Sequence, residues 1–160
     1  MLFYICAAFV VLVDQASKIL VRLNMEVGDT LPFWRNHVHF NFYENSGAAF
    51  SSFQGFGRYF VIVALALVVG VIYYRRKGEL RGVFIELGTG FLVGGAIGNA
   101  IDRTLYNKVT DFLVFGQDGG ILNLADIAIN IGMFFIMVHT LLGFWKNRKS
   151  SSHEKPLNLQ

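Results

Sequence analysis

The sequence predicts an all-α integral membrane protein with four transmembrane helices and a small extracytoplasmic β-sheet and loop subdomain. Three observations lead to this fold class. Of the 160 residues, 54% are apolar and only 16% are charged, whereas a soluble domain carries about 25% charged residues. The apolar residues fall in long blocks instead of being spread along the chain. Basic residues gather at the ends of these blocks.

Four apolar blocks have the length of a membrane span, because about 20 helical residues cross about 30 Å of hydrocarbon. They cover approximately residues 2–21, 59–74, 82–101 and 121–145. The second block is the shortest, but basic residues flank it on both sides, which is how a span ends. The predicted membrane-embedded domain therefore covers residues 1–146. Residues 147–160 are polar, Ser-rich and basic, and we expect them to form a disordered cytoplasmic tail.

The distribution of Lys and Arg predicts the orientation, since four spans place both termini on one side. The loop after the second block and the tail carry eight basic residues, namely Arg75, Arg76, Lys77, Arg81, Lys146, Arg148, Lys149 and Lys155. The opposite face carries five, namely Arg22, Arg35, Arg58, Arg103 and Lys108. The positive-inside rule places the termini in the cytoplasm. Residues 23–58 and 102–120 are then extracytoplasmic.

The outer segment before the second block contains an alternating stretch. Within residues 37–43, Val38, Phe40 and Phe42 fall on one side and polar or aromatic residues fall on the other. A period of two residues predicts a half-buried strand. Neighbouring aromatic residues suit the membrane interface, so we expect a small sheet on the outer leaflet.

The third block has a face made of glycine. Gly90, Gly94 and Gly98 recur every four residues. Such faces let helices approach closely in lipid, so this pattern predicts tight helix packing.

Polar side chains within the apolar blocks are candidates for a site. Asp14 and Lys18 are four residues apart and share a helix face, and a pair costs less in lipid than either charge alone. We interpret them either as a structural ion pair or as a wall of the site. Asn99 and Arg103 also share a face, at the outer end of the third block. They are either interfacial anchors or hydrogen-bond donors to the backbone carbonyls of a ligand.

The loop over residues 45–50, with the sequence Asn-Ser-Gly-Ala-Ala-Phe, combines an amide with small side chains. Small residues let another backbone come close, and Asn45 can form a hydrogen bond with it. As a bare pattern this is a turn. Beside a peptide-binding site it would be a contact loop.

Asp111 and Asp126 carry the main hypothesis. Asp126 leads into the fourth block, where a carboxylate costs roughly 2.5–3.5 kcal/mol. Each aspartate alone could be a helix cap or a surface acid, but Asn123 lies on the same approach to the fourth block. Two carboxylates within about 3 Å cannot both ionise cheaply, so one keeps its proton. The ionised one can activate water while the neutral one donates to a scissile carbonyl, which is aspartic-protease chemistry without a metal or cofactor.

Several other kinds of site are not supported. The lone cysteine, Cys6, excludes an internal disulfide, and no nucleophilic Ser or Cys set is visible. No Cys or compact carboxylate cluster joins His37 and His39 to complete a zinc site. The net charge of +3 is no nucleic-acid footprint, because the basic residues flank the membrane spans.

Two other function classes stay open. A small ion-coupled transporter could use Asp14, Lys18, Asp102 and Arg103 as a polar pathway. Against it, the charges gather at the outer helix ends and no inverted repeat is visible. A noncatalytic membrane scaffold gives no reason for two aspartates and Asn123 to gather at one helix end.

Four sequence blocks, in order, resemble the lipoprotein signal peptidase family, also called signal peptidase II. They are DQASK at residues 14–18, NSGAAF at 45–50, GGAIGNAIDR at 94–103, and VTDF at 109–112 together with NLAD at 123–126. The resemblance extends from about residue 10 to about residue 145.

This resemblance implies an intramembrane aspartic endopeptidase of the bacterial cytoplasmic membrane. It would remove the signal peptide from diacylglyceryl-modified prolipoproteins by cleaving before the lipidated cysteine. The implied catalytic pair is Asp111 and Asp126. The residues implied to bind substrate or support the site are Asp14, Lys18, Asn45, Gly47, Ala48, Asn99, Arg103 and Asn123. The implied partners are the prolipoprotein, membrane lipid and a globomycin-type inhibitor, with no cofactor and no nucleic acid.

Overall fold

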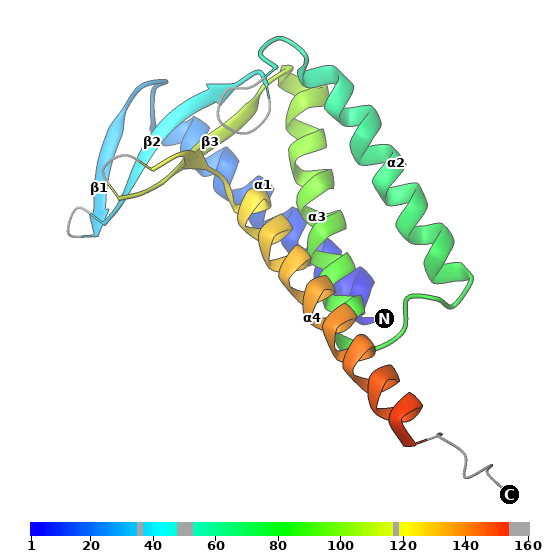
Figure 1. The fold of residues 1–160 in the computed structure, drawn as a ribbon. Helices are drawn as coiled ribbons and strands as arrows, with labels where there is room; N and C mark the ends of the chain where they lie inside the picture. The colour runs from blue at the N-terminus through cyan, green and yellow to red at the C-terminus, as the bar shows by residue number, and fades with distance from the viewer. Residues whose placement is uncertain (35–36, 48–52, 117–118, 154–160) are drawn as a thin grey trace, which may run out of the picture.

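The computed structural model of the chain describes residues 1–34, 37–47, 53–116 and 119–153. Figure 1 shows a helical bundle with a small sheet beside one end. The elements are α1 (Leu2–Asn24), β1 (Thr30–Trp34), β2 (Val38–Asn45), α2 (Gly57–Arg76), α3 (Val83–Tyr106), β3 (Val109–Phe115), β4 (Ile121–Leu122) and α4 (Leu124–His153). Four helices in the described part of the chain are long and apolar enough to cross a membrane. The predicted fold class is confirmed.

The fourth helix differs from its prediction at both ends. It begins at Leu124 instead of residue 121, because residues 121 and 122 form the short strand β4. It also continues to His153, so the expected disorder is wrong for residues 147–153, which are helical. Residues 154–160, the rest of the predicted tail, lie outside the described part of the chain.

Helix α3 is the centre of the bundle. Half of its most apolar stretch is buried inside the protein, compared with 6% of the corresponding stretch of α2. Figure 1 shows α1 and α4 beside α3, while α2 diverges from the other helices toward its C-terminal end. Most of the α2 surface is therefore left to face lipid.

The glycine face of α3 packs closely on α1, as predicted. A Cβ atom added at Gly90 would lie 2.9 Å from the carbonyl oxygen of Phe3, and one added at Gly94 would lie 2.8 Å from Cβ of Val10. Such approaches leave no room for a side chain. On the side of α4, a Cβ atom at Gly95 would lie 2.5 Å from the carbonyl oxygen of Ala125.

Replacing Gly98 by alanine should destabilise the bundle. The added Cβ would lie 2.5 Å from Oδ2 of Asp14. This carboxylate cannot easily move, because it pairs with Lys18 and accepts the N–H of Ala125. Overpacking of this kind costs roughly 1–3 kcal/mol. We expect Gly98→Ala to lower the free energy of unfolding by about that amount in detergent–SDS mixed micelles.

The matched control is Gly70→Ala in α2, where an added Cβ meets no atom within 4 Å. This variant should be at least as stable as the wild type, because alanine favours a helix more than glycine does. Equal losses of stability in the two variants would show that lipid contact, rather than the Asp14 contact, causes the effect.

The sheet has four antiparallel strands in the order β1-β2-β3-β4. Strand β2 confirms the strand predicted over residues 37–43, and its Phe42 is buried as the alternation requires. Phe42, Phe112 and Leu113 form a small core with Val21 of α1. This core attaches the sheet to the C-terminal end of α1 and places β3, which carries Asp111, at that end of the bundle.

Candidate active site

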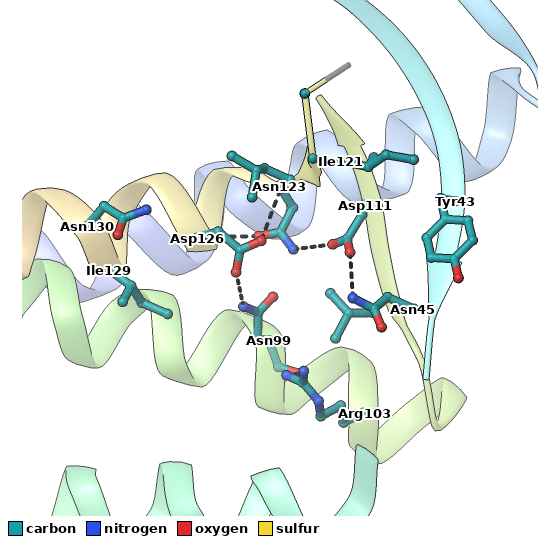
Figure 2. Close-up of a pocket in the computed structure, with 14 residues that line it drawn as sticks. Tyr43, Asn45, Asn99, Arg103, Asp111, Ile121, Asn123, Asp126, Ile129 and Asn130 are labelled. Carbon is teal, nitrogen blue, oxygen red and sulfur yellow. Dashed lines mark hydrogen bonds between the residues drawn. The ribbon is translucent and has the colours of Figure 1, made fainter. Parts of the chain in front are cut away.

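Asp111 and Asp126 face one pocket although they belong to different parts of the fold. Asp111 lies on β3, and Asp126 lies in the first turn of α4. The pocket has a volume of about 740 Å³ and lies between the sheet, the C-terminal part of α3 and the N-terminal part of α4. Its lining comprises Tyr43, Asn45, Asn99, Arg103, Val109, Asp111, Gly119, Gly120, Ile121, Leu122, Asn123, Asp126, Ile129 and Asn130 (Figure 2).

Two amides hold the carboxyl group of Asp111. Asn123 donates from Nδ2 to Oδ1 at 2.6 Å, and Asn45 donates from Nδ2 to Oδ2 at 3.0 Å. The residue is only 3% exposed. Burial raises the pKa of Asp111 from its ordinary value of 3.8 to about 6, and the negative charge of Asp126 adds to this rise. The two amide hydrogen bonds oppose it, because they favour the ionised form.

The carboxyl group of Asp126 is held by Asn99 and by a helix cap. Asn99 donates from Nδ2 to Oδ1 at 2.9 Å. The backbone N–H of Asn123 donates to Oδ2 at 3.2 Å, while Oδ1 of Asn123 accepts the backbone N–H of Asp126 at 3.0 Å. This reciprocal pair has the geometry of a capping box at the start of a helix. The Asn-x-x-Asp spacing is therefore a signal that the sequence already contained.

Asn123 links the two aspartates. It is fully buried, and its one side chain caps α4 through Oδ1 and binds Asp111 through Nδ2. Figure 2 shows its amide between the two carboxyl groups. One residue therefore contacts both acids and helps to set their relative position.

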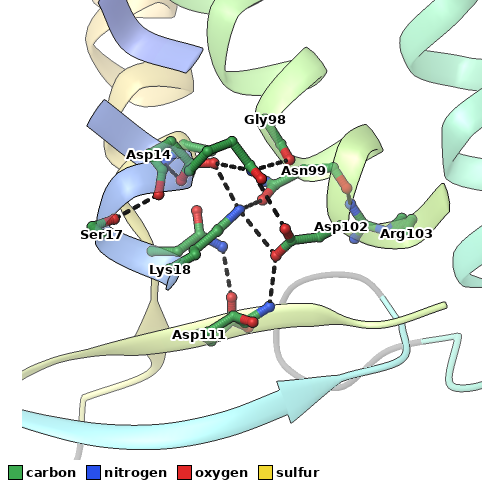
Figure 3. A network of polar contacts seen from close by, with 12 residues as sticks. Asp14, Ser17, Lys18, Gly98, Asn99, Asp102, Arg103 and Asp111 are labelled. Carbon is green, nitrogen blue, oxygen red and sulfur yellow. Dashed lines mark hydrogen bonds and ion pairs between the residues drawn. The ribbon is translucent and has the colours of Figure 1, made fainter. Parts of the chain in front are cut away.

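A buried ion network supports the site from below (Figure 3). Nζ of Lys18 lies 2.9 Å from Oδ2 of Asp14 and 3.4 Å from Oδ2 of Asp102, and it donates to Oδ1 of Asn99 at 2.9 Å. The predicted pair of Asp14 and Lys18 is therefore present, and both side chains are fully buried. Because the Asn99 oxygen accepts from Lys18, its Nδ2 is directed to Asp126.

Asp102 is a supporting residue that the sequence analysis left without an assigned partner. Its Oδ2 accepts the backbone N–H of Thr110 at 3.0 Å, and Nη1 of Arg22 donates to the Thr110 hydroxyl at 2.8 Å. These bonds tie β3 to the bundle at the residue before Asp111. Asp102 and Lys18 are fully buried and bonded within the protein, so they serve as a support for the pocket and do not form an open polar pathway.

Arg103 fastens the loop after β2. It donates from Nη2 to the carbonyl oxygen of Gly47 at 2.8 Å, and its guanidinium lies 5.2 Å from the centre of the Phe60 ring. Gly47 in turn donates its N–H to Oδ1 of Asn45 at 2.9 Å. Of the two side chains expected to donate to a ligand, Asn99 donates to Asp126 and Arg103 donates to this loop.

The remaining predicted contact residue, Ala48, lies outside the described residues. The other nine predicted site residues gather at the end of the bundle beside the sheet. Six of them line the pocket, Lys18 and Gly47 bond to residues that line it, and Asp14 pairs with Lys18.

Comparisons with known proteins agree with this arrangement. Residues 6–142 match the family model described as signal peptidase (SPase) II. The structure is similar to a bacterial membrane enzyme solved by the in meso method at 2.3 Å resolution, with 28% sequence identity and a TM-score of 0.82. That match covers 99% of this chain and 94% of the other. A second bacterial membrane enzyme, solved by the same method at 1.9 Å, is 30% identical with a TM-score of 0.79, over 87% of this chain and 92% of the other.

Proposed function

Because the chain belongs to the signal peptidase II family, we propose that it is an aspartic endopeptidase that removes signal peptides from diacylglyceryl-modified prolipoproteins. The bond cleaved is the one before the lipidated cysteine. One observation carries the catalytic type: Asp111 and Asp126 line the same pocket and are linked through Asn123. In this proposal they are the catalytic residues, and the buried network under them is the support.

The proposed reaction uses one proton shared by the pair. Asp126 is the general base, because Asp111, with its raised pKa, holds the shared proton. It takes a proton from water, and the water oxygen attacks the carbonyl carbon of the scissile bond. Asp111, with its raised pKa, gives its proton to the carbonyl oxygen. The tetrahedral intermediate then collapses: the C–N bond breaks, the leaving nitrogen takes the proton held by Asp126, and one hydroxyl of the intermediate returns its proton to Asp111 as the new carboxylic acid forms.

The position of the pocket suits a lipid-anchored substrate. It lies at the end of the bundle that the distribution of Lys and Arg places outside the cytoplasm. Acyl chains on the cysteine would remain in the outer leaflet, and each buried CH₂ group contributes about 0.8 kcal/mol of binding energy. The exposed side chains of Phe33 and Trp34 on β1 suit the same interface. We place the protein in the bacterial cytoplasmic membrane with both termini inside, and a globomycin-type inhibitor would compete for this pocket.

A cleavage assay in detergent tests this function. A purified prolipoprotein, with and without diacylglycerol on its cysteine, is incubated with the protein, and the shift in mobility is followed on a gel. Cleavage of the lipidated form alone supports both the reaction and the substrate class. If folded wild-type protein cleaves neither form, the proposed function is wrong. Cleavage of both forms would retain the peptidase and remove the lipid requirement.

The pH dependence of cleavage should report the proton on Asp111. This residue is protonated below its pKa of about 6 and loses the proton above it. In the proposed reaction, kcat/KM for the free enzyme should therefore fall on the alkaline side of pH 6. The limiting decrease is about tenfold per pH unit, as a single ionisation requires. The Asn45→Ala variant should move this alkaline decrease in kcat/KM to higher pH, because the hydrogen bond from Asn45 lowers the pKa of Asp111.

The matched control for this measurement is Asn41→Ala, four residues earlier on β2, where the amide donates to Thr30 instead. Its kcat/KM should decrease over the same pH range as that of the wild type. If the decrease in Asn45→Ala is unchanged, or shifts to lower pH, Asp111 is not the group that titrates.

A further inference from the structure

Four carboxamide side chains line the pocket, and one of them differs from the rest. Asn45, Asn99 and Asn123 each donate to an aspartate. The fourth, Asn130, forms no hydrogen bond or ion pair with any residue that the structure describes. It is an exposed residue of α4 (Figure 2). Neither periodicity nor the four sequence blocks drew attention to this residue.

The depth of Asn130 makes the free amide unusual. It follows Asp126 by four residues on α4, which is about one helical turn, or about 6 Å, further into the span. Hydrocarbon offers no hydrogen-bond partner, so an amide without a partner is destabilising there. An amide at this depth, on the wall of a pocket, is suited to a ligand that brings its own polar group into the membrane.

We propose that Asn130 is a substrate-binding residue, whose side-chain amide donates a hydrogen bond to a carbonyl oxygen of the substrate on the membrane side of the scissile bond. This inference rests on the proposed function and names a contact that the catalytic pair and its supports do not make. Within the substrate, two groups offer a carbonyl at this depth. One is the main chain of the signal peptide, and the other is an ester of the diacylglyceryl group.

The chemistry of the substrate explains why such a donor is needed. A peptide must leave its helical conformation where it is cleaved, and the carbonyls at the end of the signal helix then lack their internal partners. In hydrocarbon these carbonyls need donors from the enzyme. Of the other amides on the pocket wall, Asn45, Asn99 and Asn123 already hold carboxylates, whereas Asn130 holds none among the described residues.

The test compares Asn130→Leu with Thr140→Val. Both changes remove a polar side chain from α4 within its span. Thr140 lies outside the pocket lining, and its hydroxyl donates to the carbonyl oxygen of Ile136. We expect Asn130→Leu to raise KM for the lipidated prolipoprotein roughly three- to tenfold with little change in kcat. A change of this size corresponds to the loss of one hydrogen bond. Thr140→Val should match the wild type. Thermal unfolding of both variants checks that the protein remains folded.

Two modified substrates identify the source of the carbonyl. In the first, an ester replaces one peptide bond at a time before the scissile bond, which weakens that carbonyl as an acceptor. In the second, a dialkyl ether replaces the diacyl ester. The modification that removes the difference in KM between the wild type and Asn130→Leu identifies the carbonyl that Asn130 binds.

The outcomes separate this inference from the proposed function. Equal KM values for Asn130→Leu and the wild type on the unmodified substrate would overturn the role of Asn130 while cleavage continues. The same conclusion follows if the KM difference survives in both modified substrates. Absence of cleavage by the wild type would instead reject the proposed function.

Discussion

Replacing either Asp111 or Asp126 by asparagine is expected to abolish cleavage while the protein still folds and inserts. Asparagine has nearly the same shape as aspartate but cannot exchange the shared proton. General acid–base catalysis contributes about 10²- to 10⁴-fold for each group, so kcat should fall by at least about 10²-fold. The measurement is single-turnover cleavage of the lipidated prolipoprotein at saturating enzyme, which separates the chemical step from substrate binding.

Asp29→Asn is the control for the catalytic pair. Asp29 is an exposed acid before β1, outside the pocket lining, and its carboxylate accepts the backbone N–H of Glu26. This variant should cleave at the rate of the wild type. Full activity in Asp111→Asn or in Asp126→Asn would remove that aspartate from the catalytic pair, whatever the geometry around it.

Replacing Lys18 by methionine should cause the largest loss of stability of any single change proposed for this protein. The change leaves the buried carboxylate of Asp14 without its cation, and it leaves Asp102 with only the longer ion pair to Arg22 at 3.5 Å among the described residues. Removing one partner from a buried ion pair costs roughly 3–5 kcal/mol, because the remaining charge has no compensation. Activity should fall as well, since Lys18 also orients the amide of Asn99 that binds Asp126. Equilibrium unfolding in mixed micelles would measure the loss.

Two further variants check this explanation. Lys108→Met breaks the exposed pair with Glu44 and should cost no more than about 1 kcal/mol. Adding Asp14→Asn to Lys18→Met removes the carboxylate that has lost its cation, so the double variant should recover part of the lost stability. If Lys18→Met were no worse than Lys108→Met, the buried network would not be a major source of stability.

The sequence predicted the helices and one strand because their patterns are local. Long apolar blocks with basic ends need no knowledge of the fold, and the alternation around Phe40 and Phe42 needs only one covered face. The strand β3 escaped prediction for a physical reason. Its residues are buried from Val109 to Val114, so both faces are covered and no alternation appears. Strand β1 is exposed throughout and likewise has no buried face to create a pattern.

The candidate site was predictable in its residue types but not in its connections. Two aspartates near one membrane surface, with an asparagine beside them, indicated acid chemistry. The contacts of Lys18 with Asn99 and of Arg22 with Thr110 join residues that are 81 and 88 positions apart. No spacing rule reaches that far, since such contacts depend on how α1 packs against α3 and the sheet.

The N-terminal cap of α4 includes Asp126, so the stability of this cap affects the proposed catalytic pair. Helix ends open more readily than the bundle as a whole, and such an opening needs no global unfolding. Here it would release Asp126 from its cap and Asp111 from Asn123 in the same event. Activity on heating is therefore governed by the opening free energy of this one turn. Amide hydrogen exchange at residues 124–127 would follow the loss of activity more closely than the melting temperature of the four helices.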